Sequence, residues 1–214
     1  MNRSDNTNIS YRIIEKPDRI SYDEIADVLH DAHRSNISRG MNFLASKQTG
    51  AEIEKRFGDN GKFFTAITDD NQIAGVGAVT LHQSCKGWYG KNQPYSKITM
   101  VGVPEKYKGH GISSALYREM EKYGFSVFDL MVMNTAKDNY IVLDSNARHG
   151  WKYVDYKSFS QTDYYSPCMA KWKDGCPYSD SYCKIMYTYR KLITTVTKRK
   201  DGRHRLLFRL IKKL

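Results

Sequence analysis

Between Ile98 and Met120 the chain reads ITMVGVPEKYKGHGISSALYREM, and this stretch decides the fold. Its apolar start, Ile98–Val101, predicts a buried strand, and Pro104 ends that strand because proline cannot donate to a strand ladder. After Gly109 and Gly111, apolar residues recur at the spacing of one helix face: Ile112, Ala115, Leu116 and Met120. The stretch therefore predicts a strand, a glycine-rich turn and a helix.

The predicted turn has the properties of an anion-binding loop. The first amides of a helix have no internal partner, and the helix dipole adds positive potential there. Glycines let a phosphate approach the backbone, and Lys106 and Lys108 add charge beside it. The dinucleotide pattern G-x-G-x-x-G fails at Ser114, and the P-loop pattern is absent. The alternative is a glycine-rich turn that opens an ordinary helix.

The composition indicates one domain with an appendage. The chain has 214 residues, of which 40% are hydrophobic, enough for one real core. No signal peptide is visible, and no apolar run approaches the length of about 18 residues that a transmembrane helix needs. The four cysteines, Cys85, Cys168, Cys176 and Cys183, form no C-x-x-C pair. We therefore expect reduced thiols in a cytoplasmic protein, and no metal site.

The net charge of +11 is concentrated near the end of the chain. Residues Lys184 to Leu214 hold eleven Lys/Arg and one acid, a charge of +10, which leaves +1 for the rest. Apolar residues recur there at helical spacing, and Asp201-Gly202 separates them into two predicted helices. They are Ile185, Met186, Tyr189, Leu192, Ile193 and Val196, then Leu206, Leu207, Leu210, Ile211 and Leu214.

Three partners fit this basic tail. We expect it to pack on the main body or on a second subunit, as in a homodimer. The alternative is that it lies on an anionic membrane surface, which would make the protein peripheral to a membrane. Nucleic acid is the least favoured partner, because few aromatic residues are interleaved with the charges after Tyr189.

Periodicity along the chain predicts the order β-α-α-β-β-β-α-β-α-β-β between Tyr11 and Trp172. Ser21 and Glu24 form a capping-box pattern that predicts the start of the first helix. The order predicts a mixed α/β (α+β) sheet with helices on both faces. We expect residues 1–10 to be disordered, 11–172 to form the domain, and 173–214 to be a basic amphipathic helical extension.

The loop Lys106-Tyr107-Lys108-Gly109-His110-Gly111 resembles the acetyl-CoA pyrophosphate loop of the GNAT superfamily. Lys106 stands where relatives usually carry Arg or Gln. The element order also resembles the GNAT core, and Asn139 and Gly150-Trp151 match the start and end of its fourth helix. The resemblance implies the GNAT acyl-CoA N-acyltransferase fold. It implies an N-acetyltransferase that passes an acetyl (acyl) group from acetyl-CoA to a primary amine of a small molecule or protein by direct attack.

The resemblance also implies which residues hold acetyl-CoA. The backbone amides expected to face the pyrophosphate are those of Lys108, Gly109, His110, Gly111, Ile112 and Ser113. The backbones of Val101 and Val103 should pair with the pantetheine arm, and the Val103 amide should also polarise the thioester carbonyl. Asn139 should contact the pantetheine end; as an N-cap residue it would also suit the helix start.

Proton transfer is where this chain departs from the family. Many relatives carry a general-acid tyrosine at the position of Asn146, and several carry a glutamate base on the strand that here, from Tyr95 to Met100, has no acid. His82 is our candidate for the base. The alternative for His82 is a partly exposed histidine at a strand end. The alternative function is a weak or inactive GNAT-like CoA-binding module, recruited to a membrane surface by the tail.

The acceptor site should lie between Ser21–Phe57 and Gln83–Pro94. This region carries an aromatic set that suits sugars or flat amines: Phe43, Trp88, Tyr89 and, just after the second segment, Tyr95. The alternative is that they fill an edge of the core. Nothing in the sequence selects an acceptor.

Overall fold

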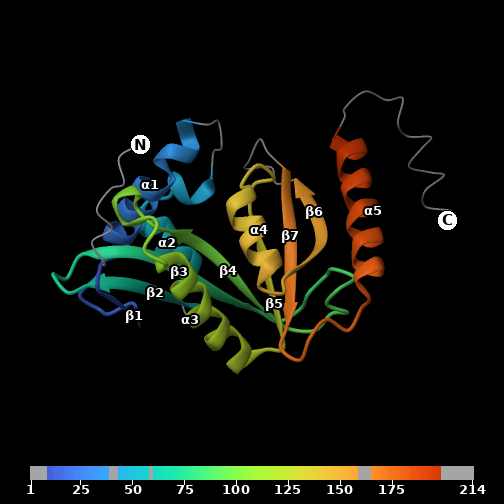
Figure 1. Cartoon of the computed structure of the whole chain (residues 1–214), viewed down its shortest axis with the longest axis horizontal. Helices are drawn as coiled ribbons and strands as arrows, with labels where there is room; N and C mark the ends of the chain where they lie inside the picture. The colour runs from blue at the N-terminus through green and yellow to red at the C-terminus, as the bar shows by residue number, and fades with distance from the viewer. Residues whose placement is uncertain (1–8, 39–42, 58–59, 159–164, 199–214) are drawn as a thin grey trace.

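The computed structural model describes residues 9–38, 43–57, 60–158 and 165–198. They form a seven-stranded sheet of order β1-β2-β3-β4-β5-β7-β6 (Figure 1). The strands are β1 (Tyr11–Glu15), β2 (Gly61–Thr68), β3 (Ile73–His82), β4 (Tyr95–Gly102), β5 (Leu130–Asn134), β6 (Lys152–Ser158) and β7 (Tyr165–Trp172). The helices are α1 (Tyr22–Ser38), α2 (Gly50–Phe57), α3 (Ile112–Val127), α4 (Tyr140–Arg148) and α5 (Asp180–Lys198), with short 3-10 turns η1 (Leu44–Ser46) and η2 (Glu105–Tyr107). The predicted element order and mixed α/β class are confirmed.

Local sequence signals explain where the first two helices begin. The Ser21 amide donates to the Glu24 carboxylate at 2.8 Å, and the Glu24 amide donates back to Ser21 Oγ at 3.1 Å, which is the predicted capping box. Thr49 and Glu52 repeat this arrangement at the start of α2. Both helices therefore begin at polar residues that satisfy their first amides.

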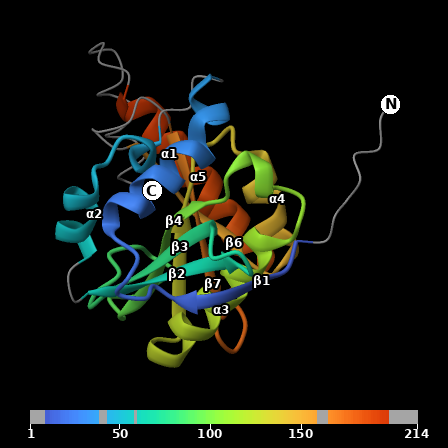
Figure 2. The ribbon, with the colours of Figure 1, turned by 90° about the vertical axis from the view of Figure 1, so that its left-hand side faces the viewer.

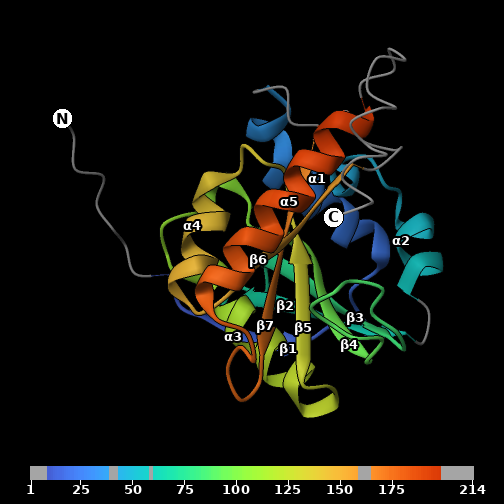
Figure 3. The same ribbon diagram turned by 90° about the vertical axis from the view of Figure 1, so that its right-hand side faces the viewer.

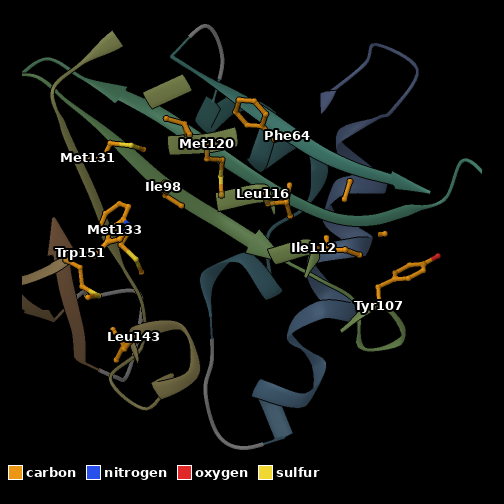
Figure 4. Packing of buried hydrophobic residues seen from close by; sticks show 14 residues of the cluster. Phe64, Ile98, Tyr107, Ile112, Leu116, Met120, Met131, Met133, Leu143 and Trp151 are labelled. Carbon is orange, nitrogen blue, oxygen red and sulfur yellow. The ribbon is translucent and has the colours of Figure 1, made fainter. Parts of the chain in front are cut away.

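The two faces of the sheet are covered by different helices (Figure 2). A Cβ added to Gly77 would meet the Met120 sulfur of α3 at 2.8 Å, whereas one added to Gly102 would meet Ala32 of α1 at 3.0 Å. Figure 4 shows the buried cluster on the α3 side, where Ile112, Leu116 and Met120 lie along the strands. The spacing predicted for the buried face of α3 is confirmed.

The sheet divides between β4 and β5, which are its one parallel pair among the described strands. The two strands are in register only from Ser96 to Ile98, opposite Met131 to Met133. Figure 1 shows them diverging beyond this point. Met100 has a left-handed backbone (φ 53°), and the register with β3 shifts there. This bulge leaves the β5-facing edge of β4 without a strand partner after Ile98.

α5 packs on β6, outside the second half of the sheet (Figure 3). Arg190 Nε donates to the buried Asp155 carboxylate at 2.7 Å, and Thr194 Oγ1 donates to the Tyr156 carbonyl at 2.7 Å. Packing of this helix on the body, as predicted, is therefore seen, but through a different face. Ile185 and Leu192, expected to be buried, are 65% and 50% exposed.

The reason is that β6 presents a buried carboxylate to this helix. A carboxylate needs a cation or donor more than an apolar contact, so the face with Arg190 turns inward. The spacing of apolar residues in the helix does not reveal that a buried carboxylate on β6 needs a cation beside it. The second predicted tail helix, after Asp201-Gly202, lies outside the described residues, as does most of the N-terminal segment 1–10. Within the described part, no helix has the length and apolarity to cross a membrane.

Candidate active site

A cavity of about 770 Å³ lies where β4 and β5 diverge. Its walls come from the end of α1, η1, α2, β4, the loop before α3, the end of β5 and the start of α4. Its volume falls in the range of about 300–1,000 Å³ typical of small-molecule sites. The bulge in β4 creates this space, because it ends the pairing that would otherwise close the sheet.

One end of the cavity is the glycine-rich loop. Gly109 and Gly111 both have left-handed backbones (φ 86° and 76°), and a Cβ on Gly109 would meet no atom within 4 Å. Gly111 is the N-cap of α3 and no side chain caps the helix, so its first amides have no side-chain partner there. The Tyr11 hydroxyl donates to the His110 carbonyl at 3.3 Å and braces the loop from β1. The result is an open cradle of amides that fits a phosphate.

Lysines and a carboxylate flank this loop. Lys108 lines the cavity, and its Nζ lies 2.6 Å from the Glu105 carboxylate. Lys106 is exposed, and its Nζ lies 4.6 Å from the centre of the Tyr107 ring, outside the cavity lining. The charge at the loop therefore comes from Lys108 more directly than from Lys106.

The middle of the cavity is lined by polar side chains from α3 and α4. Asn139 is the N-cap residue of α4, as predicted, but its side chain makes no capping hydrogen bond; its Nδ2 donates to Thr135 Oγ1 at 2.9 Å instead, and the residue lines the cavity. Tyr117 also lines the cavity, and it shares a side-chain hydrogen bond with Asn146. Burial raises the pKa of Tyr117 to about 12, so its hydroxyl stays protonated at neutral pH.

Tyr117 brings a tyrosine hydroxyl beside Asn146, the position where relatives were expected to carry one. The motif around Asn146 does not predict this hydroxyl, because Tyr117 lies on α3, 29 positions earlier in the chain. Asn146 is buried, and its Nδ2 donates to the Val142 carbonyl at 2.8 Å. Asn146 thus positions a hydroxyl rather than supplying one.

The opposite end of the cavity is cationic. Lys97 on β4 and Arg56 on α2 both line it. Burial lowers the pKa of Lys97, and the nearby Arg56 and Lys157 lower it further. Arg56 Nη1 donates to the Gln48 side chain at 3.2 Å. No motif in the sequence marks either Lys97 or Arg56 as a site residue.

Of two histidines near the cavity, His33 lines it and His82 does not. His82, the predicted base, is absent from the cavity lining; its ring stacks on Tyr95 (centroids 4.7 Å apart) and its Nε2 lies 3.0 Å from Thr80 Oγ1. Burial lowers its pKa, and Lys97 and Arg56 lower it further, so His82 lies close to the cationic end. His33 does line the cavity, and burial, together with Lys108 and His30, lowers its pKa to about 4. Both imidazoles are therefore neutral at pH 7.

Most of the predicted acceptor aromatics lie elsewhere. Phe43 lines the cavity and stacks on His33, with centroids 4.9 Å apart. Trp88, Tyr89 and Tyr95 belong to a packing cluster with Leu130 and Trp172, and Trp88 Nε1 donates to the Val154 carbonyl. Their assignment to the acceptor site is wrong: the segment after β3 folds under the far end of the sheet.

The structure brings six of the predicted cofactor residues to the cavity wall: Val101, Val103, Lys108, Gly109, Ser113 and Asn139. His110, Gly111 and Ile112 lie at the adjoining turn and the start of α3, where their backbones, rather than their side chains, would make the predicted contacts. Among the residues described, no group of three or more His, Cys, Asp or Glu side chains could hold a metal ion.

Solved structures of similar fold come from several bacteria. GNAT-family acetyltransferases from Streptococcus agalactiae and Staphylococcus aureus align with TM-scores of 0.59 and 0.58, at 14% and 12% identity. They cover 78% and 77% of this chain and 99% of their own. One from Streptococcus pneumoniae aligns with a TM-score of 0.53 at 15% identity, covering 76% and 99%. At such identities the likeness shows the fold alone.

Sequence comparison settles the family. None of the curated proteins compared with this chain matches it. The sequence model of the acetyltransferase (GNAT) family matches residues 23–150, more than half of the chain, and this span includes the glycine-rich loop, the bulged strand and α4. The chain therefore belongs to the GNAT acetyltransferase family.

Proposed function

We propose that this protein is an N-acetyltransferase that passes the acetyl group of acetyl-CoA to a primary amine. The observation that carries the proposal is the continuity of the cavity. It runs from the uncapped start of α3, along the unpaired edge of β4, to a polar chamber under α1 and α2. A cofactor with a phosphate at one end and a reactive group at the other fits such a channel.

The cofactor would be held mainly by backbone. Amides from Lys108 to Ser113 would bind the pyrophosphate, and the free edge of β4 at Val101 and Val103 would pair with the amides of the pantetheine arm. Asn139 and Thr135, joined by their hydrogen bond, would contact the same arm. Lys106 would add long-range charge only.

The reaction needs one new bond and two proton transfers. The neutral amine attacks the thioester carbonyl, a C–N bond forms, the C–S bond breaks, and CoA leaves as a thiolate. The Val103 amide would polarise the carbonyl. The nitrogen loses a proton and the thiolate gains one. Tyr117 is the candidate donor to sulfur, since it is protonated and lines the cavity. His82, acting through water, is the candidate acceptor.

A CoA-binding module without catalysis is the rival function. This rival is suggested by Asn146, which stands where many relatives carry a general-acid tyrosine. The hydroxyl of Tyr117 beside Asn146 favours the enzyme instead. A cytoplasmic location, and contact of the tail with a second subunit or a membrane, stay predictions. So do the domain limits at 11–172 and 173–214.

Two measurements on the purified full-length protein test the proposal. Calorimetric titration with CoA should give saturable binding, and acetyl-CoA with a panel of primary amines should release free thiol in proportion to acetylated product. Binding without thiol release above the rate with no amine would establish the rival function. Absence of CoA binding would contradict both.

A further inference from the structure

The cationic end of the cavity has no described counter-charge. Among the described residues, Lys97 has no ion pair or hydrogen bond from its ammonium, and Arg56 contacts only the neutral Gln48 side chain. The two described carboxylates that line the cavity are bound elsewhere: Glu105 pairs with Lys108 at 2.6 Å, and Asp138 lies 3.9 Å from Lys137. Lys97 is half-buried, and a second cation near it raises the cost of its charge unless an anion joins them.

A buried hydroxyl faces the same cavity. Ser166 on β7 is 1% exposed and lines the cavity, and its Oγ has no hydrogen-bond partner among the described residues. A buried polar group without a partner costs stability, so such groups usually mark a place that a ligand or water completes. In the sheet Ser166 lies level with Ala136, beside Thr135, whereas Lys97 lies level with Val132, so the hydroxyl faces the middle of the cavity and not its cationic end.

The cationic end lies far from the phosphate loop. Lys97 is five residues before Gly102 on β4, which corresponds to roughly 15 Å along a strand, and the loop begins beyond that. The pyrophosphate of a cofactor held at Gly109 is therefore out of reach of Lys97. The cations serve the acceptor end instead.

We infer that the acceptor is an amine that carries its own anionic group, a carboxylate or a phosphate, which Arg56 and Lys97 bind. The inference rests on the proposed acetyl transfer. The same charges also help the chemistry: they disfavour an ammonium and so favour the neutral amine that attacks the thioester. An amine without an anionic group would be repelled as an ammonium and gain nothing in return. With an anionic group, the acceptor is attracted to the two cations, while the same cations still favour loss of the proton from its ammonium.

Matched acceptors test the inference on the full-length protein. The panel is the series of ω-amino acids from glycine to 6-aminohexanoate, each beside its amide, with 2-aminoethyl phosphate beside 2-methoxyethylamine. At the best chain length the anionic amine should have a kcat/KM at least about 10-fold above its neutral partner, since a charge-assisted hydrogen bond contributes at least that much. The carboxylate and phosphate arms identify which anion fits.

Binding to the protein saturated with CoA, measured by calorimetry, gives a readout that needs no turnover. Lys97→Gln and Arg56→Gln should each weaken binding of the anionic amine by about 10-fold and leave CoA affinity within about 2-fold. Lys55→Gln, which removes an exposed cation one residue away on α2, is the matched control and should change neither. Neutral partners that bind and react as well as the anionic ones, or variants no weaker than Lys55→Gln, would overturn the inference. Loss of the proposed function looks different, because CoA itself would then fail to bind or no amine would be acetylated.

Discussion

The two ends of the cavity are built in opposite ways. The cofactor end comes from one continuous stretch, Val101 to Ser113, and uses mostly backbone groups set by two left-handed glycines. The acceptor end comes from side chains on α2 and β4, namely Arg56 and Lys97, which lie 41 positions apart in the chain. A site made of backbone is encoded locally and tolerates little change, whereas a site made of distant side chains can change its ligand one residue at a time.

The largest effect should come from blocking the backbone end. Gly109→Val should weaken CoA binding by about 10²- to 10⁴-fold, because its side chain enters the open space beside the amides and at least two charge-assisted hydrogen bonds are lost. Calorimetric titration with CoA measures this.

A matched control separates this effect from backbone strain. Gly175 also has a left-handed backbone (φ 94°) with nothing within 4 Å of a Cβ, but it lies in the turn after β7, outside the cavity lining. Gly175→Val should suffer the same strain and keep wild-type CoA affinity. Wild-type CoA affinity in a folded Gly109→Val protein would show that this loop does not bind the phosphate.

The next largest effect should come from removing the base that accepts the proton of the amine at the acceptor end. If His82 accepts the proton through water, His82→Ala should lower kcat by about 10²-fold, the low end for general base catalysis. The rate should rise with pH as the imidazole loses its proton, with a midpoint below the ordinary histidine value of about 6.5, because burial, Lys97 and Arg56 lower the pKa of His82.

Lys97→Gln sharpens this test. Removing that cation makes the imidazolium less unfavourable, so the midpoint of the pH–rate profile should move upward. Lys55→Gln should leave it in place. A profile that does not move in Lys97→Gln, or a larger loss of kcat in His33→Ala than in His82→Ala, would assign the base elsewhere.

A smaller effect on turnover is expected from Tyr117, which lines the middle of the cavity. Tyr117→Phe should lower kcat by about 10- to 100-fold, because a thiolate with a pKa near 8.5 leaves readily and needs only modest help from an acid. CoA affinity should stay within about 2-fold. Tyr123→Phe, on the same helix but outside the cavity lining, is the control. Wild-type turnover in Tyr117→Phe would return the role of proton donor to water.

The difference between the ends also explains what the sequence could predict. The strand, loop and helix around Gly109 were predictable because proline, glycine and apolar spacing act over neighbouring residues. The bulge at Met100 was not, since nothing local marks a non-glycine residue with a left-handed backbone. Without the bulge the cavity itself, and the presence of Lys97 in its wall, could not be foreseen.

Side chains from distant segments were the hardest to assign. Trp88 and Tyr95 were grouped with Phe43 because all three are aromatic and lie in segments expected near the acceptor, yet only Phe43 reaches the cavity. Nothing in the sequence singles out Tyr117, and only its contact with Asn146 shows its place. Such contacts depend on how helices lie on the sheet, which spacing along one segment does not report.

The smallest effect should come from α5, which supports the acceptor side alone. Arg190 pairs with Asp155, whose side chain is 3% exposed, while the side chain of Arg190 is 40% exposed. Arg190→Leu would leave the carboxylate with Lys157, 3.8 Å away, as its remaining cation. We expect a loss of about 2–3 kcal/mol in the free energy of unfolding, at or below the range for a fully buried pair, and a fall in Tm of about 4–12 °C.

The kinetic consequence should be confined to one end of the cavity. β6 carries both Asp155 and Lys157, and Lys157 is one of the cations that act on Lys97, so a loosened β6 should raise the KM for the acceptor a few-fold. The main packing partner of α5 is β6 and not β4, so CoA affinity should not change. Lys184→Ala, an exposed cation on the same helix, should alter neither stability nor KM. If Arg190→Leu weakened CoA binding as much as acceptor binding, the two ends would be coupled through the sheet, and the separation drawn between them would fail.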